Sequence, residues 1–135
     1  MIVDTSALLA YFDSGEPDHA AVVEAIETAE TPLIVSPYVV AELDYLVATR
    51  IGVREEALAL RELSSGAWDL ATVGRSELSK VVEIVEMYAD LDIDAADASN
   101  VLLADRHRTT TIATLDRRHF RALRPLSGGH FEIVP

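Results

Sequence analysis

The chain begins with MIVDTSALLA, residues 1–10, an apolar segment interrupted by one acidic residue. Its first three residues are apolar and predict a buried strand, and Asp4 stands at the carboxyl end of that strand, just before a predicted helix. Ligands of open α/β sheets bind in the crevice at the carboxyl ends of the strands, so Asp4 is placed where functional groups are found. Aspartate is also a good N-cap residue, and Asp4 taken alone leaves both interpretations, cap or ligand, open.

Short apolar segments alternate with helical patterns along the rest of the chain. Further strands are expected at residues 33–35, 68–73, 109–114 and 131–134. Helices are expected at residues 7–12, 18–30, 37–51, 54–63, 76–89, 94–106 and 116–123. Such alternation indicates a parallel sheet with helices on both faces. We therefore expect residues 1–135 to form a single α/β domain with three layers (α/β/α) and a central, mainly parallel sheet of about four to five short strands.

The composition narrows the class of protein. Apolar residues make up 50% of the chain and charged residues 25%, which is the balance of a globular domain rather than of a disordered chain. There is no cysteine, which rules out disulfides and thiolate zinc sites. No apolar run approaches the roughly 20 residues of a membrane span, and the start lacks the basic region of a signal peptide. We expect a cytoplasmic protein that does not enter a membrane.

The formal net charge of −12 argues against a general nucleic-acid binder, but the charge is unevenly distributed. Acidic residues dominate the segments 24–30 and 77–94, whereas residues 105–124 are basic. The arginines of this basic segment are Arg106, Arg108, Arg117, Arg118, Arg121 and Arg124. They form either a solvated face or a set of phosphate contacts. The histidines, which are His19, His107, His119 and His130, show no metal-ligand spacing and are expected on the surface.

Four acidic residues far apart in the sequence are expected at one edge of the sheet. Asp4 and Asp116 each follow the carboxyl end of a predicted strand. A helix that leads into a parallel strand begins at that same edge, which places Asp97 there, in the first turn of its helix. Glu42 is about five residues into the helix after strand 33–35, roughly 7–8 Å along the axis, and so lies near the same edge.

Each of these acids also has a purely structural explanation. Asp97 and Asp116 are suitable first-turn or N-cap residues of their helices. Glu42 lies in an otherwise apolar stretch, where an unpaired acid is costly. Asp44 is a competitor on roughly the opposite side of the same helix, and spacing alone favours Glu42 only slightly.

A cluster of carboxylates is tolerated when a hard cation lies among the oxygens, since otherwise the acids raise one another's pKa. Mg²⁺ and Mn²⁺ take carboxylate and water ligands in octahedral geometry. Such an ion can generate hydroxide from water and stabilise charge on a phosphoryl group. The acids therefore indicate a metal-dependent phosphodiesterase, with arginines such as Arg117 and Arg118 as contacts for the phosphates of the substrate.

The motifs that carry the four acids resemble those of PIN domains. The opening MIVDTSALLAYF (residues 1–12) is similar to the start of these domains, and SPYVVAEL (residues 36–43) resembles their segment with a helix-borne glutamate. ADASN (residues 96–100) and TLDRRHF (residues 114–120) resemble the third and fourth acidic stations. Size and motif order match the VapC toxins of bacterial toxin–antitoxin pairs over essentially the whole chain.

This resemblance implies an endoribonuclease that uses Mg²⁺ or Mn²⁺. The residues it implies are Asp4 and Asp97 as the surest metal ligands, Glu42 and Asp116 as the remaining acids of the pocket, and Ser6, Asn100 and Thr114 as supporting or substrate-binding groups. It also implies a structured RNA substrate such as transfer or ribosomal RNA, a homodimer, and a cognate VapB antitoxin that can place a basic side chain in the acidic pocket. The net charge of −12 suits such a basic partner.

Two other functions are weighed against this one. A strand-end aspartate can be the nucleophile of an aspartyl-phosphate phosphatase or receiver, but such sites generally want a lysine, and the single lysine, Lys80, is expected in mid-helix. Ser6 also stands where the second acid of an Asp-x-Asp pair would be. The third function is that of a PIN binding module without activity, and the presence of all four acids argues against it.

Overall fold

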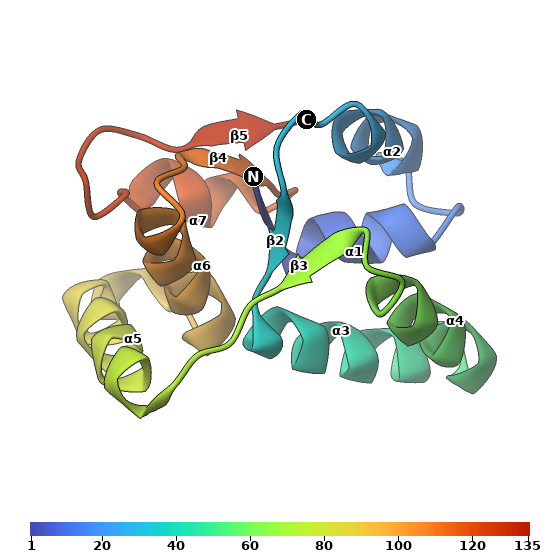
Figure 1. Ribbon diagram of the computed structural model, residues 1–135, viewed down its shortest axis with the longest axis horizontal. Coiled ribbons are helices and arrows are strands. Elements are labelled where there is room, and N and C mark those ends of the chain that lie inside the picture. The colour runs from blue at the N-terminus through green and yellow to red at the C-terminus, as the bar shows by residue number, and fades with distance from the viewer.

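The chain folds around a parallel sheet of five short strands, shown in Figure 1. The computed structural model describes residues 1–135. The strands are β1 (Ile2–Val3), β2 (Leu33–Val35), β3 (Trp68–Leu70), β4 (Thr111–Ala113) and β5 (Glu132–Val134). They lie in the order β3-β2-β1-β4-β5, and every pair is parallel. The expected α/β class with a parallel central sheet is confirmed.

Strand β1 is the centre of the sheet. Ile2 lies opposite Ile34 of β2 on one side and opposite Ile112 of β4 on the other. The backbone N–H of Asp4 donates to the carbonyl oxygen of Ala113 at 2.9 Å. Since these parallel strands are in register, they end at the same edge, and the residues that follow β1 and β4 become neighbours.

Helices connect the strands on both faces. They are α1 (Thr5–Phe12), α2 (His19–Glu27), α3 (Pro37–Arg50), α4 (Val53–Leu63), α5 (Arg75–Met87), α6 (Ala95–Arg106), α7 (Arg117–Ala122) and the short 3₁₀ helix η1 (Ala89–Leu91). All but η1 are predicted from the sequence. η1 is followed by Asp92 in the left-handed conformation, with φ of 57°, which ends the turn and redirects the chain into α6. None of the helices is both long and apolar enough to cross a membrane.

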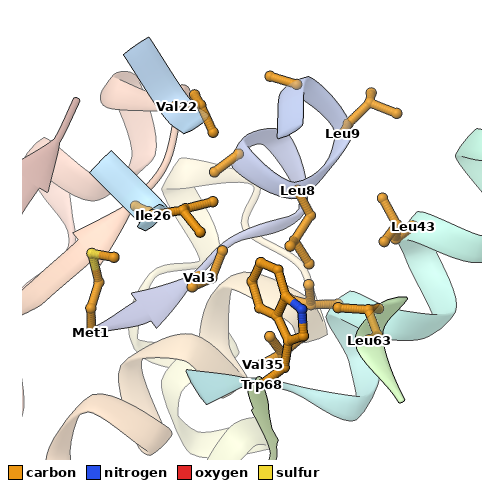
Figure 2. Packing of buried hydrophobic residues seen from close by; sticks show 14 of the residues in the cluster. Met1, Val3, Leu8, Leu9, Val22, Ile26, Val35, Leu43, Leu63 and Trp68 are labelled. Atoms are coloured by element: carbon orange, nitrogen blue, oxygen red, sulfur yellow. The ribbon is translucent and has the colours of Figure 1, made fainter. Parts of the chain in front are cut away.

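The sheet divides the hydrophobic core into two clusters. Helices α1 to α4 cover one face, where Val3, Leu8 and Leu43 pack together, as Figure 2 shows. Helices α5 to α7 cover the other face, where Ile2 packs with Phe120. Ile2 and Val3 enter different clusters because successive strand residues point to opposite faces of a sheet. The result is the three-layer arrangement expected from the sequence.

Two helix starts set the position of candidate site residues. Ser36 is the N-cap of α3 and its hydroxyl accepts from the backbone N–H of Tyr38 at 3.2 Å. Asp94 is the N-cap of α6, and its carboxylate accepts from two backbone N–H groups at 2.8 and 3.0 Å. These caps fix where α3 and α6 begin, and therefore how far Glu42 and Asp97 lie from the edge of the sheet.

Candidate active site

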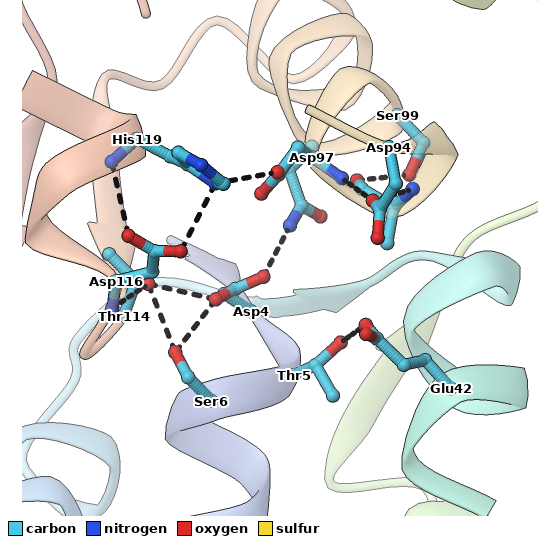
Figure 3. Close-up of polar contacts among 12 residues, drawn as sticks. Asp4, Thr5, Ser6, Glu42, Asp94, Asp97, Ser99, Thr114, Asp116 and His119 are labelled. Atoms are coloured by element: carbon cyan, nitrogen blue, oxygen red, sulfur yellow. Dashed lines mark hydrogen bonds and ion pairs between the residues drawn. The ribbon is translucent and has the colours of Figure 1, made fainter. Parts of the chain in front are cut away.

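A cavity opens at the carboxyl edge of the sheet, bordered by α1, α3, the start of α6 and the start of α7. The residues that line it are Asp4, Thr5, Ser6, Leu9, Glu42, Leu46, Arg50, Asp94, Asp97, Asp116 and His119. All four acids that the sequence places at this edge are among them. Figure 3 shows how these side chains approach one another from separate elements.

Asp4 is almost completely buried, with 5% of its surface exposed. Its Oδ2 accepts from the hydroxyls of Ser6 and Thr114, both at 2.8 Å, and its Oδ1 accepts from Nδ2 of Asn100 at 3.0 Å. Burial raises the pKa of Asp4, while the hydrogen bonds from Ser6 and Thr114 act in the opposite direction. Asp4 occupies the N-cap position of α1, but its carboxylate makes no capping hydrogen bond. The side chain is therefore oriented by the side chains of Ser6, Asn100 and Thr114 and not by capping the backbone of α1.

The polar residues around Asp4 support it from three elements. Asn100 and Thr114 are completely buried, so they hold Asp4 in place instead of meeting a substrate. Ser6 lines the cavity and its hydroxyl also accepts from the backbone N–H of Leu115 at 2.9 Å. This bond ties the start of α1 to the end of β4.

His119 lies in the cavity, and the expectation that it is a surface residue is wrong. Its side chain is 21% exposed, and its Nδ1 lies 3.0 Å from Oδ2 of Asp97 and 3.1 Å from Oδ2 of Asp116. The other carboxylate oxygen of Asp116 accepts from the backbone N–H of His119 at 3.1 Å, which makes Asp116 the N-cap of α7 as well. A sequence signal was present, because residues three apart at a helix start lie on the same side.

Asp97 has a strongly raised pKa. Its pKa is raised to about 7, first by burial and then by the neighbouring charges of Asp4 and Asp94, whereas His119 acts in the opposite direction. Asp97 is 9% exposed. Acids with a strongly shifted pKa in a cleft are typical of functional sites, and a bound cation would stabilise their charged form here.

Glu42 is held by Thr5, whose hydroxyl donates to Oε2 of Glu42 at 2.6 Å. Burial raises the pKa of Glu42. Asp44, the competitor on the same helix, does not line the cavity and faces Glu56 of α4, whose pKa it raises. The structure therefore brings Glu42, and not Asp44, to the other acids.

The arginines of the basic segment do not line the cavity, although Asp116 and His119 of the same segment do. Neither Arg117 nor Arg118 lines it, and the guanidinium of Arg117 donates to the carbonyl oxygen of Pro135 at 2.7 Å. Arg106 pairs with Glu77 at 2.8 Å on the far side of the molecule, between α6 and α5. The expected phosphate contacts of Arg117 and Arg118 are thus not part of the cavity wall. Arg50 does line the cavity, and sequence reasoning did not identify it.

The donor set suits a hard divalent cation. Carboxylates dominate the cavity wall, and Oδ1 of Asn100, behind Asp4, is buried without a hydrogen-bond partner. No three Asp, Glu or His side chains are already in coordination geometry. Because His119 lies between Asp97 and Asp116, binding an ion among these residues requires side-chain rotation. The single lysine, Lys80, is exposed on α5, so it cannot neutralise the acids.

The comparisons with known proteins agree with this geometry. A family model described as the PIN domain matches residues 1–124, and the chain is a PIN-domain protein. It is also 63% identical to Ribonuclease VapC26 of Mycobacterium tuberculosis across 135 residues, which is 100% of both chains. At this identity and coverage the chain belongs to the VapC family of PIN-domain ribonuclease toxins.

Two solved structures resemble the fold. VapC20 of Mycobacterium tuberculosis, described as a sarcin-ricin loop cleaving toxin, superposes with a TM-score of 0.86 at 19% identity, over 99% of this chain and 98% of that one. FitAcB of Neisseria gonorrhoeae superposes with a TM-score of 0.58 at 18% identity, over 88% and 89%. At such identities these structures establish the fold alone.

Proposed function

We propose that the chain is a Mg²⁺- or Mn²⁺-dependent endoribonuclease toxin that cuts structured RNA, such as transfer or ribosomal RNA, in the cytoplasm and arrests growth. One observation carries the proposal above all others. Asp4, Glu42, Asp97 and Asp116 come from four separate elements to one cavity, with no lysine among them. Such a concentration of carboxylates, with Asp4 and Asp97 buried, favours a cation that can bind a phosphodiester.

Within this proposal Asp4 and Asp97 hold the ion, and Glu42 and Asp116 complete the acidic pocket. The bound ion supplies Lewis-acid activation of water and of the phosphodiester. The side chains behind the acids hold the carboxylates in position. Asp4 is oriented by three hydrogen bonds, from Ser6, Thr114 and Asn100, and Glu42 is oriented by Thr5. These supporting residues are needed because a displaced carboxylate would lose its alignment with the ion.

The partners follow from the charge of the chain and of the cavity. The net charge of −12 and the acidic wall suit a basic segment of a cognate VapB-type antitoxin. A basic side chain that enters the cavity would occupy the place of the cation and inhibit cleavage. We further propose that the toxin acts as a homodimer, as the family resemblance implies.

The deciding experiment incubates the purified protein with total bacterial RNA in Mg²⁺, in Mn²⁺ and in EDTA, and maps the new 5′ ends. Cleavage at defined positions with either ion, and none in EDTA or with Asp97→Asn, would support the proposal. An Asp97→Asn protein that cuts as well as the wild type would contradict the site.

The two alternatives give different results in the same series. An aspartyl-phosphate protein would be labelled by acetyl phosphate and would cut no RNA. The exposed position of Lys80, outside the cavity, disfavours that outcome, because such sites use a lysine to hold the phosphate. A non-catalytic PIN module would bind its antitoxin and cut no RNA with any metal.

A further inference from the structure

One cation of the cavity has no part in the site described so far. Arg50 is the last residue of α3, it is exposed, and it lines the cavity. His119 is the other basic residue in the wall, and it is engaged by Asp97 and Asp116. We propose that Arg50 binds a backbone phosphate of the RNA a few nucleotides from the cleaved phosphodiester and so positions the strand over the acids. This inference rests on the proposed function.

The guanidinium of Arg50 is free to accept a ligand. It makes no hydrogen bond or ion pair within the chain, whereas Arg106 is paired with Glu77 at 2.8 Å and Arg117 donates to Pro135 at 2.7 Å. An arginine offers a planar set of donors that matches two phosphate oxygens at once. Arg50 is therefore both available and chemically suited to a phosphate.

The position of Arg50 on α3 fits a bound strand. Glu42, Leu46 and Arg50 follow one another at intervals of four residues and all line the cavity. Eight residues of helix separate Glu42 from Arg50 by about 12 Å along the axis, the length of a few nucleotides of a stacked strand. Leu46 and Leu9 are the apolar part of the wall between them. A strand that leaves the acids along α3 would thus meet Arg50.

The net charge of the molecule favours such a contact. A chain of net charge −12 with an acidic cavity repels a polyanion at long range. A cation at the rim of the cavity offsets this repulsion where the backbone must pass. Arg50 also stands at the carboxyl end of a helix, where a positive charge stabilises the helix dipole, so the test must separate binding from stability.

The test measures RNA binding without cleavage. Arg50→Ala and Arg54→Ala are each made in an Asp97→Asn background, and a fluorescent stem-loop RNA is titrated in Mg²⁺ by anisotropy. Arg54 is the matched control, because it is exposed at the start of α4, outside the cavity, and its removal changes the charge equally. Arg50→Ala should weaken binding by about tenfold at low salt and reduce the slope of log K against log [salt] by about 0.7. Arg54→Ala should stay within about twofold of its parent.

Kinetics of the otherwise wild-type protein give a second readout. Arg50→Ala should raise KM with kcat nearly unchanged, because the contact forms in both the bound substrate and the transition state. Arg50→Lys should recover part of the loss. Thermal unfolding separates the two roles of Arg50. Loss of the dipole interaction alone would lower the thermal midpoint of Arg50→Ala and leave its RNA affinity, measured far below that midpoint, equal to that of Arg54→Ala.

Equal affinity and salt slope for Arg50→Ala and Arg54→Ala would overturn the inference. The proposed function is contradicted by a different result, namely that the wild-type protein cuts no RNA with any metal. In that case the binding titration still tests whether Arg50 contacts RNA. Cleavage by the wild type together with unchanged binding by Arg50→Ala would reject the role of Arg50 alone.

Discussion

Asn100 of α6 donates a hydrogen bond of 3.0 Å from its Nδ2 to Oδ1 of Asp4, a residue 96 positions earlier at the end of β1. The Oδ1 atom of the same amide is buried without a partner. The amide therefore supplies a donor to a buried carboxylate while its own acceptor stays unsatisfied. Leaving a buried acceptor unpaired is unfavourable, and the contact with Asp4 is the one that offsets it.

Replacing Asn100 should affect Asp4 and the stability of the fold together. Asn100→Ala is expected to lower the free energy of unfolding by about 2 kcal/mol and RNA cleavage by about tenfold or more, because one oxygen of Asp4 loses its donor. Urea unfolding and initial cleavage rates check the two effects. Ser99→Ala is the control: Ser99 is also buried in α6 but bonds to Ser36 at 2.6 Å, so its loss should cost stability and leave cleavage nearly unchanged. Equal cleavage by the two variants would contradict the positioning role of Asn100.

The stability of the metal-free protein should depend on pH through Asp97. Its pKa is about 7 in the folded protein and 3.8 in the unfolded chain, so between these values the folded state keeps a proton that the unfolded state has released. The free energy of unfolding should therefore fall as pH rises from about 4 to about 7, and the Asp97 contribution should be constant above that. A difference of about three pKa units corresponds to a contribution of at most about 4 kcal/mol.

Asp97→Asn should remove this contribution, which denaturant unfolding in EDTA at several pH values would measure. The control is Asp69→Asn, at an exposed aspartate of β3 outside the cavity. Its free energy of unfolding should decrease with rising pH as much as that of the wild type. The assignment to Asp97 is rejected if Asp97→Asn and the wild type lose the same stability between pH 4 and pH 7.

Adding or removing the divalent ion should change both activity and stability. EDTA should stop cleavage, and an excess of Mg²⁺ or Mn²⁺ should restore it. At pH 8, an ion at 100 times its Kd should raise the free energy of unfolding by about 2.7 kcal/mol. Asp4→Asn and Asp97→Asn should lose this gain in a thermal-shift titration. An undiminished Mg²⁺ response in both variants would place the ion elsewhere.

The contact between Thr5 and Glu42 predicts a coupled pair. Glu42→Gln should reduce cleavage by about 100-fold, and Thr5→Val, which keeps the shape of the side chain, by about tenfold through the orientation of Glu42. The double variant should be no worse than Glu42→Gln, because the hydroxyl of Thr5 acts through this carboxylate. Additive losses in a double-mutant cycle of initial rates would show that Thr5 acts independently.

Much of the site was predictable from parallel-sheet geometry. Asp4 and Asp116 follow strands that pair in one sheet, and Asp97 begins the helix that leads into β4, so all three had to reach one edge. Their contacts were not predictable. The spacing places His119 beside Asp116, but the sequence does not show that His119 also approaches Asp97, because that contact depends on how α6 and α7 pack.

The arginines show where sequence reasoning is weakest. Six of them cluster within residues 105–124, and the density of charge suggested phosphate contacts there. Arg117 instead donates to the last residue of the chain, while Arg50, isolated in the sequence, reaches the cavity. A high density of charge along the sequence does not show where the charged side chains point, because the rotation of each helix decides which of them face a cavity.

The alternation of strands and helices, and the edge of the sheet at which Asp4, Asp97 and Asp116 lie, could be read from the sequence alone. This was possible because strand periodicity and helix caps are visible in short segments, and because the strands of a parallel sheet all end at the same edge. Only the tertiary structure decided that Asn100 and Thr114 hold Asp4, that Glu42 rather than Asp44 faces it, and that His119 lies between two acids. These outcomes depend on how helices far apart in the chain rotate and pack, which no local pattern encodes.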